Sequence, residues 1–112
     1  MKISVLESGS FCKVTLNGRL DANSSADAER GLFDVIAKGN GSMLLDLSEL
    51  EYVSSAGLRV MLVAAKRVQQ RGGKLALYGL NGNVREVFDI SGFTAVFKIF
   101  DDEPGATGFL KA

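Results

Sequence analysis

Apolar and polar residues alternate along the first part of the chain and then change to the spacing of a helix. Residues 3–7 and 11–17 predict two strands, joined at 8–10 by a turn of hairpin length. Every other residue of the second strand is apolar, so we expect Cys12 to be a core side chain and not a reactive thiol. A helix is expected after Ser24, because apolar residues then recur on one helical face: Ala28, Leu32, Val35 and Ile36.

The middle of the chain predicts a buried strand and a second helix. Residues 43–47 are almost continuously apolar, which favours a central strand that is covered on both faces. Glycine-containing segments end the two helices, Gly39-Asn40-Gly41 the first and Gly72-Gly73 the second. The second helix carries its apolar stripe on Leu58, Met61, Leu62, Ala65 and Val68.

The last third of the chain predicts two more strands and a short helix. The strands are expected at 74–79 and 95–100, with the helix between them ending at Gly92. A final helix from Pro104 is only weakly favoured, because glycines interrupt it. Parallel strands need crossover helices, so the order ββαβαβαβ(α) predicts an α/β fold with a mixed β-sheet packed against helices, in one domain over 1–112.

The composition excludes several kinds of chemistry. The 112 residues contain no histidine and one cysteine, so histidine-based acid–base catalysis, Ser-His-Asp triads and an intramolecular disulfide are excluded. Thirteen basic residues balance thirteen acidic ones, which leaves no overall field to attract nucleic acid or anionic lipid. The apolar runs are too short for a membrane span or a signal peptide. We therefore expect a cytoplasmic protein with no metal, cofactor, nucleic-acid or membrane partner.

Two adjacent serines, Ser54 and Ser55, stand where the second helix is expected to begin. A helix N-terminus has unpaired N–H groups and the positive end of the helix dipole. A serine there can cap the helix or, once modified, hold a phosphate. Local chemistry alone leaves both roles open and favours the cap.

Several segments, in the same order along the chain, resemble the bacterial anti-sigma factor antagonists, which are single-domain STAS proteins. Residues 52–58, after Asp46-Leu47-Ser48, are similar to the phosphorylation-site signature of that family. Gly18-Arg19-Leu20-Asp21 resembles the segment that precedes the family's first helix. Gly73-Lys74 and residues 87–93 resemble its C-terminal half.

The resemblance implies a switch between partners. In that family the serine two residues before the glycine, here Ser55, accepts phosphate from a serine kinase that doubles as an anti-sigma factor. The unmodified protein binds this kinase and frees a sigma factor. The phosphorylated protein releases the kinase until a metal-dependent serine phosphatase removes the phosphate. The resemblance also implies a monomer, with a partner surface on Asp21, Ser54, Ser55, Ala56, Gly57 and Arg59.

Two of these residues have a second interpretation. Ser54 stands where an aspartate commonly precedes the phosphoacceptor, and we expect it to cap the helix, with a second phosphoacceptor as the alternative. Asp21 resembles the family's acid beside the phosphorylation loop, but it could equally be a turn or capping residue before the first helix. Asp46 ends a buried strand. We expect it to face the loop that carries Ser54 and Ser55, here called the serine loop, or to cap its own loop.

Two other functions are open alternatives to the switch. One is a STAS-like structural adaptor subunit of a transport or signalling complex, without a phosphorylation cycle. The other is a small enzyme that would use Asp21 or Asp46. We do not expect catalysis, because the sequence offers no nucleophile, metal or cofactor to work with these two carboxylates.

Overall fold

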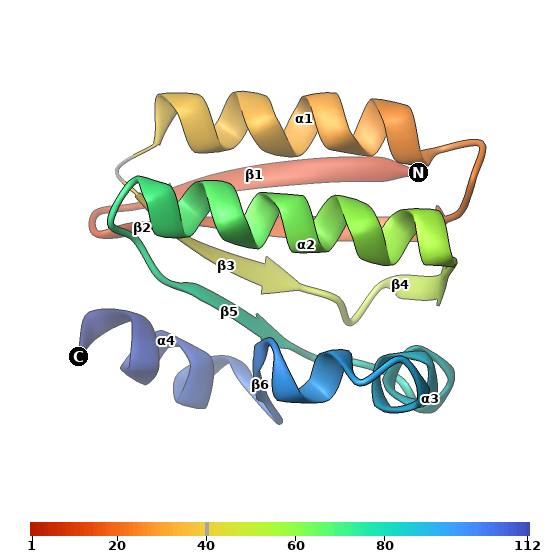
Figure 1. Ribbon diagram of the computed structural model, residues 1–112. Helices are drawn as coiled ribbons and strands as arrows, with labels where there is room; N and C mark the ends of the chain where they lie inside the picture. Colours follow the sequence, from red (N-terminus) through yellow and green to blue (C-terminus); the bar gives the residue numbers. More distant parts are fainter. Residues whose placement is uncertain (40) are drawn as a thin grey trace.

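A six-stranded mixed sheet with helices on both faces forms the fold of this chain (Figure 1). The structure is a computed structural model that describes residues 1–39 and 41–112, so Asn40 of the predicted Gly39-Asn40-Gly41 turn lies outside it. The elements follow one another as β1 (Lys2–Ser8), β2 (Phe11–Leu20), α1 (Ser25–Lys38), β3 (Ser42–Asp46), β4 (Leu50–Val53), α2 (Ser55–Gln70), β5 (Leu75–Tyr78), α3 (Gly82–Ile90), a 3-10 turn η1 (Phe93–Ala95), β6 (Lys98–Phe100) and α4 (Glu103–Lys111).

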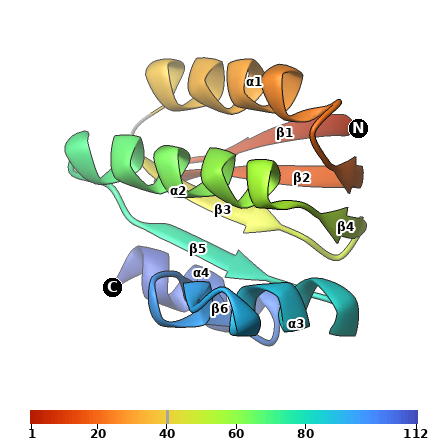
Figure 2. The same ribbon diagram turned by 45° about the vertical axis from the view of Figure 1, so that its right-hand side comes forward.

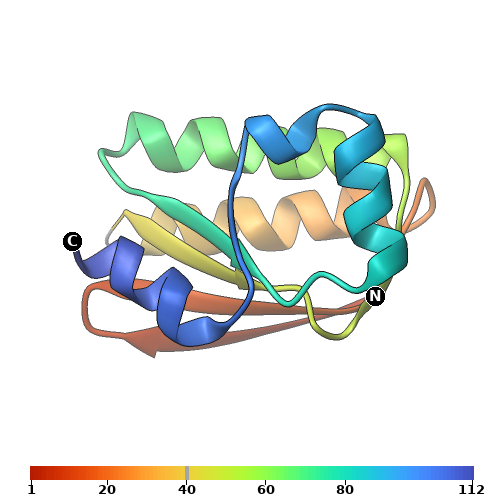
Figure 3. The same ribbon diagram turned by 90° about the horizontal axis from the view of Figure 1, so that it is seen from below.

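One antiparallel hairpin lies beside parallel strands, as the sequence predicts. Their order is β1-β2-β3-β5-β6, and only the β1–β2 pair of that row is antiparallel. Helices α1 and α2 lie side by side on one face of the sheet (Figure 2), and α4 lies on the other (Figure 3). The predicted α/β class with a mixed sheet is confirmed.

Each face of the sheet has its own core. Between the sheet and helices α1, α2 and α3 lies the larger core, which includes Leu45, Met61 and Phe88. On the opposite face α4 covers a smaller core of Phe11, Leu44, Ala76, Tyr78, Ala106 and Leu110. Neighbouring residues Leu44 and Leu45 point to opposite cores, since side chains alternate along a strand. The prediction that strand 43–47 is covered on both faces is therefore confirmed.

The predicted element order lacks one strand that the structure contains. Residues Leu50–Val53 form β4, which pairs in parallel with the second half of β2, whereas the sequence analysis predicts no strand there. Only Leu50 and Val53 are buried, so this short strand does not show the alternation that identifies strands. β2 is ten residues long and pairs with β3 through its first half and with β4 through its second.

The C-terminal elements also differ from their predicted extents. The strand expected at 95–100 is limited to β6 at Lys98–Phe100, because η1 takes up the residues after Gly92, whose φ is 77°. The weakly favoured final helix forms as α4. Asp102 caps it by accepting a hydrogen bond from the Gly105 N–H at 2.9 Å, and the helix buries Ala106 and Leu110. Capping and burial outweigh the helix-breaking tendency of its glycines.

Within the described ranges 1–39 and 41–112, no helix has both the length and the apolar character needed to cross a membrane.

Candidate functional site

The serine pair lies at the end of the molecule where α1 and α2 both begin (Figure 1). Each helix follows a strand of the parallel part of the sheet, α1 after β2 and α2 after β4. The carboxyl ends of these paired strands therefore bring the two helix N-termini together.

Ser54 is the N-cap of α2. Its backbone is extended, with φ −96° and ψ 176°, and its Oγ accepts a hydrogen bond from the Gly57 N–H at 3.2 Å. Its own N–H donates to the Leu20 carbonyl at 2.9 Å, which ties the start of α2 to the end of β2. The expected capping role of Ser54 is confirmed.

Gly57 lets α2 approach the sheet closely. A Cβ at this position would lie 2.7 Å from both the carbonyl oxygen and Cγ of Leu20, and 2.9 Å from Cγ2 of Val53. The residue is buried and has no side chain to offer a partner. Gly57 therefore packs closely beneath the serine loop. The family resemblance had assigned it to the partner surface.

Ser55 is the first residue of α2, and it is exposed. Together with Ala56 and Arg59 it lines one wall of a surface groove. The opposite wall and the floor come from residues that the sequence analysis did not single out: Ser25, Ala26 and Glu29 of α1, and Val60 of α2. The signal that could have identified the α1 residues is topological, because parallel strands place successive helix N-termini at one edge of the sheet.

Asp21 caps the turn before α1 and lies in an adjoining hollow with Arg19 and Asn23. Its carboxylate accepts hydrogen bonds from the backbone N–H groups of Asn23 at 3.0 Å and Ser24 at 3.1 Å. These bonds, led by the one from Ser24, lower the pKa of Asp21. Asp21 is therefore a turn residue, whereas the N-cap position of α1 is Ser24, and Asp21 is not among the residues that line the groove beside Ser55.

Arg19 and Tyr52 form an exposed pair next to Asp21. The Arg19 guanidinium lies 4.4 Å from the centre of the Tyr52 ring, and its Nε is 3.8 Å from Oδ2 of Asp21. Strand register brings the two residues together, since Arg19 of β2 is level with Tyr52 of β4. Sequence reasoning could not place Tyr52 here, because β4 was not predicted.

Asp46 does not face the serine loop, so that prediction is wrong. Side chains alternate along β3, and Asp46 therefore points to the same face as Leu44, the face that α4 covers. Its Oδ1 accepts hydrogen bonds from the Ser48 side chain at 2.6 Å and the Ser48 N–H at 2.9 Å, as in the alternative loop-capping role. Burial alone would raise the pKa of Asp46. The hydrogen bonds with Ser48, a hydrogen bond with Tyr78 and the charge of Lys13, 3.9 Å away, outweigh burial, so the pKa of Asp46 is lowered.

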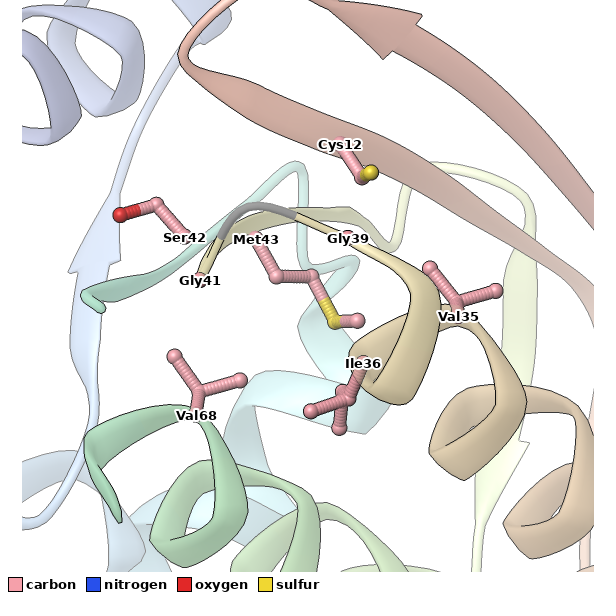
Figure 4. Close-up of a pocket in the computed structure, with 8 residues that line it drawn as sticks. All are labelled: Cys12, Val35, Ile36, Gly39, Gly41, Ser42, Met43 and Val68. Carbon is pink, nitrogen blue, oxygen red and sulfur yellow. The ribbon is translucent and has the colours of Figure 1, made fainter. Parts of the chain in front are cut away.

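Cys12 is a core side chain, as predicted, with 2% of its surface exposed. It points toward the small apolar space between the end of α1 and β3, near Val35, Ile36 and Met43 (Figure 4). Burial raises the pKa of its thiol, and the hydrogen bond that Sγ donates to Glu7 at 3.3 Å adds to the effect. A thiol in this state is a weak nucleophile.

The groove beside Ser55 has the character of a binding surface. Within residues 1–39 and 41–112, no three Cys, Asp or Glu side chains come together as a metal site. The groove beside Ser55 combines a free hydroxyl, one acid, one base and an apolar floor. Such a surface suits a protein partner.

Comparison with known proteins gives consistent results. The family model described as the STAS domain matches residues 2–106. BtrV of Bordetella bronchiseptica, whose name places it among anti-sigma factor antagonists, is 36% identical over 111 residues, 99% of this chain and 96% of BtrV. The anti-sigma F factor antagonist of Paenibacillus polymyxa is 31% identical over 94 residues, 83% of this chain and 80% of that protein.

Solved structures share the fold at lower sequence identity. An anti-sigma factor antagonist from Thermotoga maritima superposes with a TM-score of 0.91 at 22% identity, over 98% of this chain and 95% of that one. The phosphorylated form of SpoIIAA from Bacillus superposes with a TM-score of 0.71 at 16% identity, over 91% of this chain and 92% of SpoIIAA.

Proposed function

This chain belongs to the STAS domain family, and to the anti-sigma factor antagonists within it, and from this premise we propose that Ser55 is the phosphoacceptor of a partner switch. The unphosphorylated chain binds an anti-sigma factor that is also a serine kinase. Phosphorylation of Ser55 releases the kinase, and a metal-dependent serine phosphatase resets the switch. In this proposal the chain acts in the cytoplasm as a monomer, without catalysing a reaction itself.

The division of labour between the two serines is the observation that carries the proposal. Ser54 already caps α2, so the Ser55 hydroxyl is not needed for the helix. Ser55 is exposed on the wall of the groove, where a kinase could reach it. An accessible hydroxyl beside a filled cap position suits modification without loss of the helix.

Electrostatics explains how a phosphate would change binding and leave the fold intact. Phosphorylation adds about 1.5 to 2 negative charges at pH 7. The start of α2 tolerates this charge, since the helix dipole stabilises an anion there by roughly 0.3–1 kcal/mol. Glu29 lines the same groove. A phosphate on Ser55 would add to its negative charge and so change which partners can dock there.

Two measurements test the proposal. Mass spectrometry after incubation with ATP and the candidate anti-sigma factor kinases is expected to find one phosphate, on Ser55. In a binding titration, Ser55→Ala is expected to hold the kinase even with ATP present. Ser55→Asp is expected to bind at least about tenfold more weakly, because the new charge is desolvated at the interface. Equal affinity of the two variants would contradict the switch and support the structural adaptor.

The partner surface is proposed to centre on Ser55, Ala56 and Arg59, which line the groove. Asp21 and Ser54 contribute through the turn and the cap that shape its rim. Gly57 contributes by holding α2 close to the sheet.

A further inference from the structure

A second groove lies near the other end of α2, away from the serine pair. Its lining includes Gln69 of α2, Leu75 at the start of β5 and Phe109 of α4, together with Lys74, Val96 and Lys98. We call it the basic groove. Gln69 follows Ser55 by fourteen residues of α2, which corresponds to about 21 Å along the helix axis. A partner in this groove would leave the Ser55 end accessible.

The groove exists because β6 is short. The first paired residue of β6, Lys98, is level with Ala76, so Leu75 at the start of β5 has no strand beside it on this side. α2 and α4 lie on opposite faces of the sheet at this point (Figure 3), and they form the walls of the space that a longer β6 would fill.

The charge of this groove is one-sided. Of its described lining residues two are lysines and none is acidic. Lys98 is exposed and forms no ion pair with the described part of the chain. Lys74 donates to the backbone oxygens of Phe109 at 3.3 Å and Ala112 at 2.8 Å. Lys66, in the last turns of α2, is another exposed cation, whereas Arg67 and Arg71 face α1: the Arg67 guanidinium lies 3.9 Å from the centre of the Phe33 ring, and Arg71 donates to the Gly39 carbonyl at 3.2 Å. The lining of the basic groove is thus positive, although the net charge of the chain is zero.

The same groove presents apolar surface. Val96 is 56% exposed and lies at the edge of the groove. Leu75 and Phe109 are half-buried beside it. Cations without carboxylate partners around apolar side chains are complementary to a ligand that has both carboxylates and an apolar anchor. The walls of the groove suit a peptide segment better than a flat bilayer.

We propose that the basic groove binds an acidic segment of a partner protein, with one large apolar side chain seated against Val96 and carboxylates paired with Lys98 and Lys74. The segment binds whether or not Ser55 is phosphorylated, because the two sites lie at opposite ends of α2. Together with the proposed switch, such a groove would let the chain hold one protein while it exchanges another at the serine pair. This proposal does not depend on the phosphorylation switch.

Site-specific photo-crosslinking identifies the segment. A photoreactive benzoylphenylalanine replaces Val96 in the full chain in its host cell, and mass spectrometry sequences the captured peptide. The matched control places it at Ile90, which is 79% exposed and lies outside the groove lining. We expect Val96, and not Ile90, to capture a segment with several carboxylates and a large apolar residue. No capture at Val96, or capture of a neutral or basic segment, would overturn the proposal.

A titration with the captured segment as a synthetic peptide then tests the charges. Lys98→Glu is expected to weaken binding by about tenfold or more, and salt to weaken binding to the wild type. Lys2→Glu makes the same charge change on β1, outside the groove, and is expected to leave the affinity within about twofold. Ser55→Asp is expected to bind like the wild type. Circular dichroism checks that each variant is folded. Equal losses from Lys98→Glu and Lys2→Glu would contradict the proposal.

An experiment with lipid vesicles distinguishes a peptide ligand from a membrane surface. Vesicles of phosphatidylcholine, with and without phosphatidylglycerol, are sedimented with the wild type and with Lys98→Glu. We expect no co-sedimentation. Binding to the anionic vesicles that Lys98→Glu abolishes would assign the basic groove to a lipid surface and overturn the peptide proposal.

Discussion

Two neighbouring serines of the same chemistry have different tasks because one peptide unit separates them. Ser54 has extended backbone and turns its Oγ back to the Gly57 N–H, whereas Ser55 has already entered the helix and is exposed. An aspartate at position 54, as in the family signature, could accept the same hydrogen bond. The replacement of that aspartate by serine therefore keeps the cap and removes a negative charge beside Ser55.

The stability of Ser54 variants tests the capping role of this residue. Ser54→Ala is expected to lower the free energy of unfolding by about 1 kcal/mol, because the Gly57 N–H loses its acceptor. Ser54→Asp is the control and is expected to retain wild-type stability or exceed it slightly, since a carboxylate also caps and favours the helix dipole. Urea unfolding followed by circular dichroism measures both. Equal destabilisation by the two substitutions would show that the cap is not the source of the effect.

At the scale of elements, the position of α2 depends on one close approach. The Leu20 carbonyl oxygen accepts from the Ser54 N–H and lies 2.7 Å from where a Cβ of residue 57 would be. The start of α2 is thus held to the end of β2 by a hydrogen bond and by the missing side chain of Gly57. A larger residue there would have to move the helix and the serine loop together.

A pair of glycine substitutions separates this packing from helix propensity. Gly57→Ala is expected to lower the free energy of unfolding by about 1–3 kcal/mol, because its Cβ meets a backbone oxygen that cannot move alone. Gly108→Ala is the control: it lies inside α4 with no atom within 4 Å of its Cβ, and it is expected to stabilise the chain by about 0.5–1 kcal/mol. Thermal unfolding measures both. A stabilising Gly57→Ala would contradict the close approach.

The elements also show what a sequence can and cannot predict. Strand 43–47 was predictable because burial on both faces gives a continuous apolar run. β4 was not, because its burial comes from a long β2 that pairs twice, a property of the sheet and not of residues 50–53. Ser55 was identified by its signature, whereas Glu29 and Ala26 enter the site only through the neighbouring positions of α1 and α2.

At the scale of the whole molecule, a polar cluster joins the sheet to α4. Lys13 lies 3.1 Å from Oε2 of Glu103 and 3.9 Å from Oδ2 of Asp46, and its Nζ is 5.9 Å from the centre of the Tyr78 ring. Burial, together with Asp46, raises the pKa of Tyr78 to about 12. Hydrogen bonding with Tyr78 raises the pKa of Lys13 as well.

This cluster predicts how global stability changes in alkaline solution. The folded chain keeps the Tyr78 proton to higher pH than the unfolded chain does, so its contribution is complete below pH 10 and is lost as the pH rises toward 12. Lys13 has a shift of the same sign and loses its contribution in the same direction. Urea midpoints at about pH 8 and about pH 11 are expected to differ more for the wild type than for Tyr78→Phe. Equal differences would contradict the shifted phenol.

The shared groove of α1 and α2 has a practical consequence for following the proposed switch in real time. Ala26 lies on the α1 wall, across from Ser55 and on a different helix, and its side chain is exposed. An environment-sensitive fluorophore on Ala26→Cys would sense a phosphate on Ser55, the proposed phosphoacceptor, without altering that residue. The native thiol, Cys12, is buried and would escape labelling under mild conditions. One substitution would turn this chain into an optical reporter of its own modification state.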